Sequence, residues 1–206
     1  MKVSRPYSAV CPTIDGEVLQ VLAGTTRLLT GREVSRLTGR SSHSGVLDVL
    51  HRLTEHGLVT RVELNRAFLF SLNREHLAAP AVDTLMGMRT ELVNRIRRAA
   101  EAWEVHPTHL SLFGSAARGD GDTQSDIDLF VVRPRDVNAD NSGWRAQLEE
   151  LSSQIERWTG NHASISEVAE MDIAQLREQE RPIVAALRAD AIGLGGCELD
   201  RLLTAA

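Results

Sequence analysis

The chain has 206 residues, of which 42% are hydrophobic and 25% charged, and its formal net charge is −5. This is an ordinary globular composition, long enough for one large domain or two small ones. No run of about 18 or more apolar residues occurs, which argues against a transmembrane helix, and the N-terminus lacks the apolar segment of a secretory signal. Cys11 and Cys197 have no metal-ligand spacing, so we expect plain thiols and a cytoplasmic protein without membrane partners.

The first third of the chain predicts three helices followed by a β-hairpin. Apolar residues recur at helical spacing over 13–23. A second helix begins at Thr30, which forms a capping-box pattern with Glu33, and ends at Gly39. A third helix is expected over 42–56. The alternating segment that follows predicts two strands joined at Asn65 and Arg66.

This order of elements resembles a winged helix-turn-helix, which we assign to residues 1–78. Residues 1–75 hold ten Lys or Arg and seven Asp or Glu (10 − 7 = +3), whereas the remainder is acidic. In the DNA-binding interpretation the third helix enters the major groove and Arg66 reaches a phosphate or the minor groove. The residues expected to face the DNA are Arg40, Ser41, Ser42, His43 and Arg66. A protein or dimer interface is the alternative, because a surplus of three charges is modest for a DNA-binding protein.

The rest of the chain, residues 79–206, predicts a second α+β domain. It opens with a linking helix over 79–104, and the strand Leu110–Phe113 follows. Later elements are expected in chain order as a strand near 126–132, a helix over 144–158, a strand over 163–168, a helical stretch over 173–187 interrupted by Pro182, and an edge strand over 191–194.

The segment LSLFGSAARGDGDTQSDIDLFVV, residues 110–132, carries the most informative pattern. Because side chains alternate along a strand, Asp126 and Asp128 should share one face, about 7 Å apart. Two such carboxylates repel each other unless a cation lies between them, and Mg²⁺ or Mn²⁺ is the usual one. The turn at Gly114 and Ser115 supplies backbone N–H groups of the kind that bind phosphate.

The same segment resembles the signature of the minimal nucleotidyltransferases in the DNA polymerase β superfamily. The elements of that signature are a Gly-Ser turn, an Arg-Gly pair and a Ser-Asp-x-Asp motif before an apolar run. They are present here as Gly114, Ser115, Arg118, Gly119, Ser125, Asp126 and Asp128.

The resemblance implies a mixed sheet flanked by helices, a nucleoside triphosphate substrate and two bound divalent ions. Gly114, Ser115, Arg118 and Ser125 would bind the nucleotide, which we expect to be ATP. A third carboxylate is expected on a later strand, where Glu167 is the candidate for a metal ligand and general base. Two alternatives remain open: Glu167 as an exposed strand residue, and Arg118 as a salt-bridge partner of Asp120 or Asp122.

These expectations favour a metal-dependent enzyme that moves a nucleotidyl group from a triphosphate to a hydroxyl on a protein, an RNA or a small molecule. The alternative is a transcription regulator that senses nucleotide. A third interpretation is an antitoxin-like protein that modifies a partner toxin and represses its own operon. An antibiotic-modifying transferase is disfavoured, because the short C-terminal part leaves little room for a drug pocket. A homodimer is also expected, since winged helices often bind two-fold sites.

Overall fold

The structure is a computed structural model that describes residues 1–39, 41–178 and 182–204. It divides into two compact units, one formed by Arg5–Arg89 and the other by Met1–Ser4 together with Thr90–Ala206. The boundary expected after residue 78 falls inside the first of these units. The reason is that Val82 is buried with the N-terminal helices and belongs to their core.

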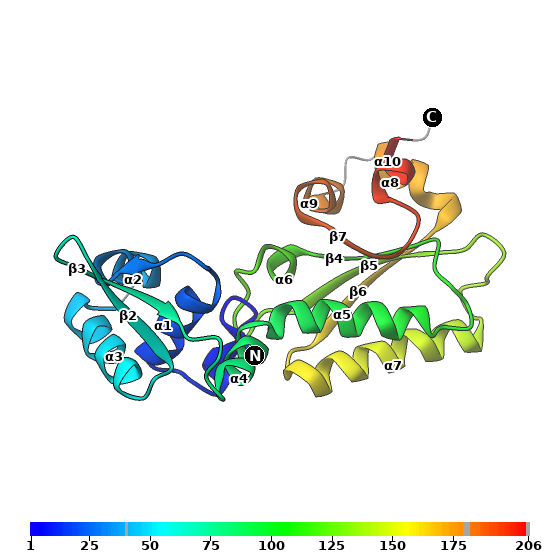
Figure 1. Cartoon of the computed structure of the whole chain (residues 1–206). Coiled ribbons are helices and arrows are strands. Elements are labelled where there is room, and N and C mark those ends of the chain that lie inside the picture. The colour runs from blue at the N-terminus through cyan, green and yellow to red at the C-terminus, as the bar shows by residue number, and fades with distance from the viewer. Residues whose placement is uncertain (40, 179–181, 205–206) are drawn as a thin grey trace. The chain divides into compact units, whose positions relative to one another are not determined.

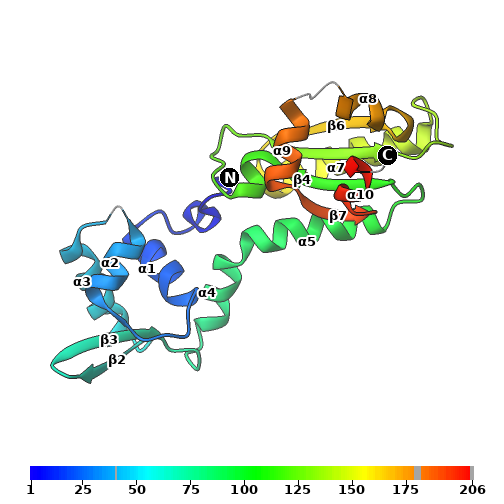
Figure 2. The same cartoon turned by 90° about the horizontal axis from the view of Figure 1, so that it is seen from above.

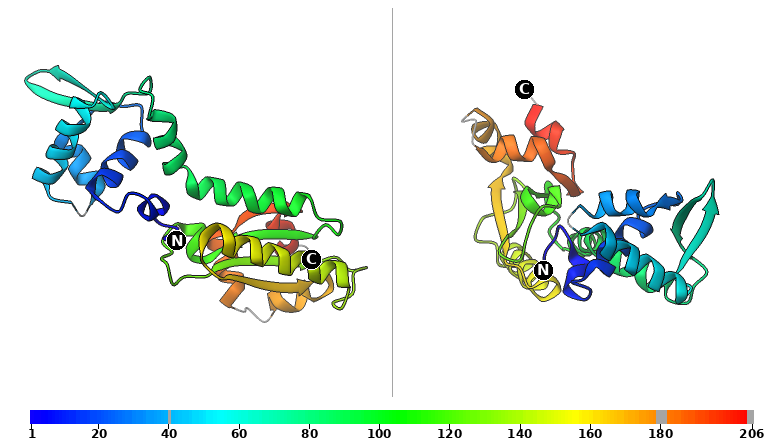
Figure 3. Two further views of the ribbon diagram at one scale, coloured as in Figure 1. Left: turned by 90° about the horizontal axis from the view of Figure 1, so that it is seen from below. Right: turned by 90° about the vertical axis from the view of Figure 1, so that its left-hand side faces the viewer.

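The N-terminal unit consists of short helices and one small sheet. Its helices are η1 (Pro6–Ala9), α1 (Ile14–Ala23), α2 (Gly31–Thr38), α3 (His43–Glu55) and α4 (Ala79–Met86). Its strands are β1 (Leu29–Thr30), β2 (Val59–Leu64) and β3 (Ala67–Leu72), which pair antiparallel in the order β1-β3-β2. The three helices and the hairpin of the sequence prediction are therefore present, and Figure 3 shows the hairpin extending beyond the helices of its unit.

Local sequence signals explain the ends of these elements. The Thr30 hydroxyl accepts a hydrogen bond from the Glu33 N–H, and the Glu33 carboxylate accepts one from the Thr30 N–H, which completes the predicted capping box. Asn65 and Arg66 have positive φ angles of 49° and 63°, as expected for a two-residue hairpin turn. Gly87 separates α4 from α5 (Met88–Glu101), so the single linking helix predicted over 79–104 is two helices.

The C-terminal unit is a four-stranded mixed sheet with helices on both faces. Its strands are β4 (His109–Phe113), β5 (Ile127–Arg133), β6 (Ala163–Ala169) and β7 (Ile192–Gly196), in the order β6-β5-β4-β7. Only the pairing of β5 with β6 is parallel. The helical segments are α5, α6 (Gly114–Arg118), α7 (Ser142–Thr159), η2 (Glu170–Asp172), α8 (Ile173–Glu178), α9 (Pro182–Asp190) and α10 (Leu199–Thr204).

Alternation along β5 sends its side chains into two separate cores. Ile127, Leu129 and Val131 pack with α5 and α7, whereas Phe130 and Val132 pack with α8, α9 and α10. Figure 1 shows these two groups of helices on opposite faces of the sheet, and Figure 2 shows α9 lying over the strands. Asp128 alternates with Phe130, so it lies on the face that α9 covers.

The first four residues of the chain belong to this unit. The Met1 ammonium donates a hydrogen bond to the Thr159 carbonyl at 2.7 Å, and the Ser4 N–H donates one to the Gly121 carbonyl at 3.1 Å. Val3 is buried in the core between the sheet and α5. No helix in the described part of the chain is both long and apolar enough to pass through a bilayer.

Candidate active site

Asp126 and Asp128 lie close together at the start of β5. Asp128 is the second residue of that strand and pairs with Phe113 of β4 and Ser164 of β6. Asp126 is the residue just before the strand. The pKa of the half-buried Asp128 is raised, first by burial and then by the neighbouring charge of Asp126, while Arg118 partly opposes the shift. The repulsion that the sequence predicts between the two carboxylates is therefore present.

Gly114 brings the backbone against Asp128. Its φ is +69°, which disfavours any residue with a side chain. A Cβ atom built on Gly114 would lie 2.6 Å from the Asp128 Oδ2, closer than two such atoms can approach. Glycine is thus required here for two independent reasons, its positive φ and the proximity of the carboxylate.

A third carboxylate, that of Asp190, occupies this corner of the sheet. Asp190 is the last residue of α9, and its side chain is only 9% exposed. Its Oδ1 accepts a hydrogen bond from the Gly114 N–H at 3.2 Å, and its Oδ2 accepts one from the Arg118 Nη1 at 2.6 Å. Its charge also contributes to the raised pKa of Asp128. Asp190 is not predictable from the sequence alone, because no local motif surrounds it and it is 72 residues from Arg118.

Arg118 forms salt bridges within the protein. Its Nε donates to the Asp120 carboxylate at 3.0 Å, in addition to the bond from Nη1 to Asp190. The salt-bridge alternative of the sequence analysis is therefore realised with Asp120, and a second partner is added. Both contacts hold the guanidinium at the end of α6, beside the Gly114 N–H.

The loop between α6 and β5 is organised by hydrogen bonds of its own. The Ser115 carbonyl accepts N–H groups from Gly119, Asp120 and Gly121. The Asp122 Oδ1 accepts the N–H of Gln124 and both the N–H and the hydroxyl of Ser125, which lowers the pKa of Asp122. Asn161 fastens the loop to the end of α7 by donating to the carbonyls of Asp122 and Ser125. Ser125 thus shapes the loop immediately before the two aspartates.

Glu167 is not brought together with the two aspartates, and this corrects the expectation that it completes their metal site. In the β5–β6 register Asp128 pairs with Ser164, whereas Glu167 pairs with Val131, which faces α5 and α7. A shift of three residues places Glu167 on the opposite sheet face and about 10 Å further along the strand. There its Oε1 accepts hydrogen bonds from Arg133 Nε at 2.8 Å and Trp144 Nε1 at 3.1 Å.

The positions on β6 that share the face of Asp128 are Ser164, Ser166 and Val168, none of which is a carboxylate. Ser164 pairs with Asp128 and Ser166 with Phe130. Within residues 1–39, 41–178 and 182–204 no group of three or more His, Cys, Asp or Glu side chains is arranged to hold a metal ion. Of the predicted carboxylates, Asp126 and Asp128 lie together here, while the neighbouring Asp190 is bound to Gly114 and Arg118.

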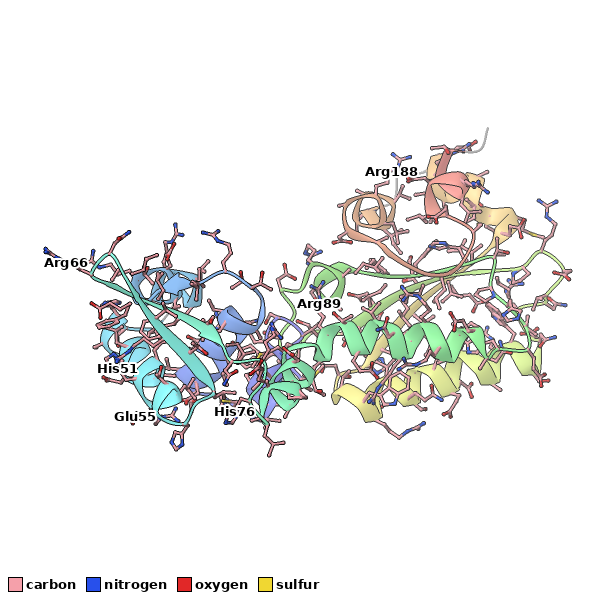
Figure 4. The ribbon with its side chains drawn as sticks, viewed as in Figure 1. His51, Glu55, Arg66, His76, Arg89 and Arg188 are labelled. Atoms are coloured by element: carbon pink, nitrogen blue, oxygen red, sulfur yellow. The ribbon has the colours of Figure 1, made fainter. Side chains whose placement is uncertain are left out.

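The residues predicted to contact DNA lie in the N-terminal unit, except that Arg40 falls outside the described residues. The Ser41 hydroxyl donates to the Glu17 carboxylate, and the Ser42 hydroxyl caps α3 by accepting the Gly45 N–H at 3.2 Å. His43 is the exposed first residue of α3. Arg66 lies at the tip of the β2–β3 hairpin, as Figure 4 shows. The two serines therefore have structural contacts, whereas His43 and Arg66 are exposed.

Comparison with known proteins supports the nucleotidyltransferase part of the resemblance. A family model described as a nucleotidyltransferase domain matches residues 93–183. The matched range contains β4, α6, β5 and β6, and thus Gly114 and both aspartates, but it ends before Asp190. No curated protein and no solved structure gave a significant match.

Proposed function

We propose that the C-terminal unit is a metal-dependent nucleotidyltransferase that moves a nucleoside monophosphate from a triphosphate to an acceptor hydroxyl. The observation that carries this proposal is the pair Asp126 and Asp128 beside the Gly114 backbone, within the segment that matches the family model. ATP is the expected donor. In the reaction the acceptor oxygen bonds to the α-phosphorus, the bond to pyrophosphate breaks and the acceptor proton is released to solvent.

The two aspartates fit a divalent cation such as Mg²⁺ or Mn²⁺. Mg²⁺ is commonly held by one or two carboxylates, with substrate phosphates supplying further oxygens, so a third protein carboxylate is not required. Burial and the charges of Asp126 and Asp190 raise the pKa of Asp128, and a bound cation would favour its charged form. When bound, the ion would neutralise negative charge on the phosphates and on the leaving group. The expectation of two ions rests on the resemblance alone.

The chain's own residues have separate parts in binding. Gly114 leaves room for close approach to its N–H group, and Arg118 supplies a guanidinium beside it. Both donors are presently bound by Asp190, so a triphosphate that uses them must displace that carboxylate. Ser115 and Ser125 position the loop that carries the aspartates.

The direct test is a labelling experiment on the full chain. Incubation with Mg²⁺, a cell extract and ATP, GTP, CTP or UTP labelled at the α-phosphate should give a labelled product. The Asp126→Ala, Asp128→Ala double variant should give none. Equal labelling by the wild type and the double variant would refute the proposal.

For the N-terminal unit we propose DNA binding, because Arg66 is exposed at the tip of a hairpin and His43 at the start of α3. Binding of this kind would allow the protein to regulate an operon, including one that encodes a toxin partner. A shift of promoter DNA by the wild type, lost in the Arg66→Ala, His43→Ala variant, would support this function. Equal DNA affinity of the two proteins would argue for a protein or homodimer interface instead.

A further inference from the structure

The C-terminal unit contains a pocket of about 330 Å³ that none of the predicted site residues lines. It lies between β4, β7, α9 and α10. The residues that matter for its chemistry are His109, Ser111, Arg188, Gly193 and Asp200. Figure 4 labels Arg188 on α9. The volume is at the lower end of the range found for small-molecule sites.

Two buried polar groups at this pocket have no hydrogen-bond partner in the described part of the chain. They are the Nε2 of His109 and the Oγ of Ser111. The two residues are 1% and 0% exposed, and they share one face of β4 because they are two positions apart. Buried polar groups are nearly always hydrogen-bonded, so two such groups without a protein partner at a pocket are available to a molecule that enters it.

The protonation state of His109 determines which hydrogen-bonding group a bound molecule needs at this position. Its Nδ1 lies 2.7 Å from the Cys197 carbonyl oxygen, which only accepts hydrogen bonds, so Nδ1 carries the proton. Burial lowers the pKa of His109 and keeps the ring neutral. Nε2 is therefore an acceptor that needs an O–H or N–H donor. The Ser111 hydroxyl can donate and accept, which suits a hydroxyl group of the ligand.

The pocket is on the same sheet face as the candidate active site. Ser111 pairs with Phe130, and Phe113 pairs with Asp128, so Ser111 is two residues along β4 from the position beside Asp128. That spacing corresponds to about 7 Å. A small molecule in the pocket and a nucleotide at the aspartates would therefore be neighbours.

We propose that this pocket binds the acceptor of the nucleotidyl transfer, and that the acceptor is a small neutral molecule rich in hydroxyl groups. This inference rests on the proposed function. Ser111 and His109 hold one part of the acceptor and direct another hydroxyl towards the α-phosphate. Arg188, Glu198 and Asp200 bring charges of both signs to the lining of the pocket, which suits a polar ligand without net charge.

Gly193 permits a variant that fills the pocket. It pairs with Ser111 on β7 and so faces the same side, and a Cβ atom built on it meets nothing within 4 Å. Gly193→Leu should therefore occupy the pocket without disturbing the core. Gly143→Ala is the control, at a glycine outside the pocket. A Cβ atom built on Gly143, near the start of α7, meets only the Asn141 Oδ1 within 4 Å, at 3.4 Å, and Gly143 does not line the pocket. Ser111→Ala removes the hydroxyl without adding volume.

The test is nuclear magnetic resonance of the full chain labelled with ¹⁵N-histidine. D-Ribose, which carries hydroxyl donors, should shift the His109 Nε2 resonance to saturation, and 1,4-dioxane, a ring of similar size without donors, should not. Gly193→Leu should abolish the response, Ser111→Ala should weaken it and Gly143→Ala should retain it. A pocket that holds only water would give no saturable shift with ribose, and that result would overturn the proposal.

A second measurement separates this proposal from the proposed function. Gly193→Leu should bind ATP with Mg²⁺ as the wild type does, yet transfer should fall about tenfold or more because the acceptor is misplaced. Unchanged transfer by Gly193→Leu would overturn the acceptor pocket and leave the transferase intact. If the wild type neither binds ATP nor labels a product, the proposed function fails, and the ribose titration still decides whether the pocket binds a polyol.

Discussion

The carboxylate of Asp190 accepts a hydrogen bond from the backbone N–H of Gly114 at 3.2 Å, while its second oxygen binds Arg118. An internal anion thus binds the Arg118 guanidinium and one backbone N–H of the Gly114-Ser115 turn that the sequence predicts to bind phosphate. Asp190→Asn removes the competing charge, so it should tighten ATP binding by about tenfold, the equivalent of one charge-assisted hydrogen bond.

Asp120→Asn is the matched control for this variant. Asp120 also binds Arg118, but its side chain is 61% exposed, so water screens its charge and ATP affinity should barely change. Fluorescence titration with a labelled ATP analogue measures both variants. Weaker binding by Asp190→Asn would mean that Asp190 assists the nucleotide and does not compete with it.

Asp128→Asn should stabilise the protein in the absence of metal. The burial and the two neighbouring carboxylates that raise the pKa of Asp128 all disfavour its charged form. We expect the midpoint of thermal unfolding to rise by about 2 °C or more. The wild type should be stabilised by Mg²⁺ with ATP, since ligands that bind only the folded state raise its stability, and the variant should lose that response. Equal stabilisation of the wild type and Asp128→Asn by Mg²⁺ with ATP would show that Asp128 is not a metal ligand.

Gly114→Ala should be markedly destabilising. The substitution combines a φ of +69° with a Cβ atom 2.6 Å from the Asp128 Oδ2. Gly160→Ala, at the end of α7, has nearly the same φ of +70° but no atom within 4 Å of its Cβ. Gly160→Ala should therefore cost about 1–2 kcal/mol, the cost of the backbone conformation alone, and Gly114→Ala should cost more. Urea unfolding measures the free energy of unfolding of both variants. Equal losses of stability would show that the Asp128 side chain moves away from the new Cβ atom at no cost.

Glu167→Gln should affect stability and not nucleotide binding. The Glu167 carboxylate binds Arg133 and Trp144 on the sheet face opposite Asp128, and the side chains of Glu167 and Arg133 are only 18% and 15% exposed. Loss of the charge leaves Arg133 without its ion-pair partner and should cost about 1–3 kcal/mol in urea unfolding. ATP affinity with Mg²⁺ should remain that of the wild type. A large loss of ATP affinity in Glu167→Gln would show that Glu167 is a metal ligand after all.

His109 should make stability depend on pH. Burial lowers its pKa in the folded state. The unfolded chain therefore takes up a proton near pH 6.5, where the folded protein does not. The stability that neutral His109 contributes is fully present above pH 6.5. It is lost as the pH falls from 6.5 towards the lower pKa that His109 has in the folded protein. Urea unfolding between about pH 5 and 7 should show stability rising with pH, less steeply in His109→Gln. An identical pH dependence of the unfolding free energy in the wild type and His109→Gln would show that His109 does not cause it.

The elements and the two aspartates could be predicted because their determinants are local. The capping box at Thr30, the turn at Asn65 and the proximity of Asp126 to Asp128 each depend on a few consecutive residues. The match of the family model to residues 93–183 agrees with the motif found there. The break between α4 and α5 at Gly87 was missed, because apolar spacing alone does not distinguish one long helix from two.

The sequence by itself determined that Gly114, Arg118, Asp126 and Asp128 lie near one another, since only a turn and a short loop separate them. The tertiary structure alone decided which distant carboxylate joins them. Pairing of β7 with β4 places Asp190 beside Gly114, whereas the β5–β6 register turns Glu167 to the opposite face. The physical reason is that a strand's side chains alternate, so the face of a residue depends on pairing with strands far away in the chain.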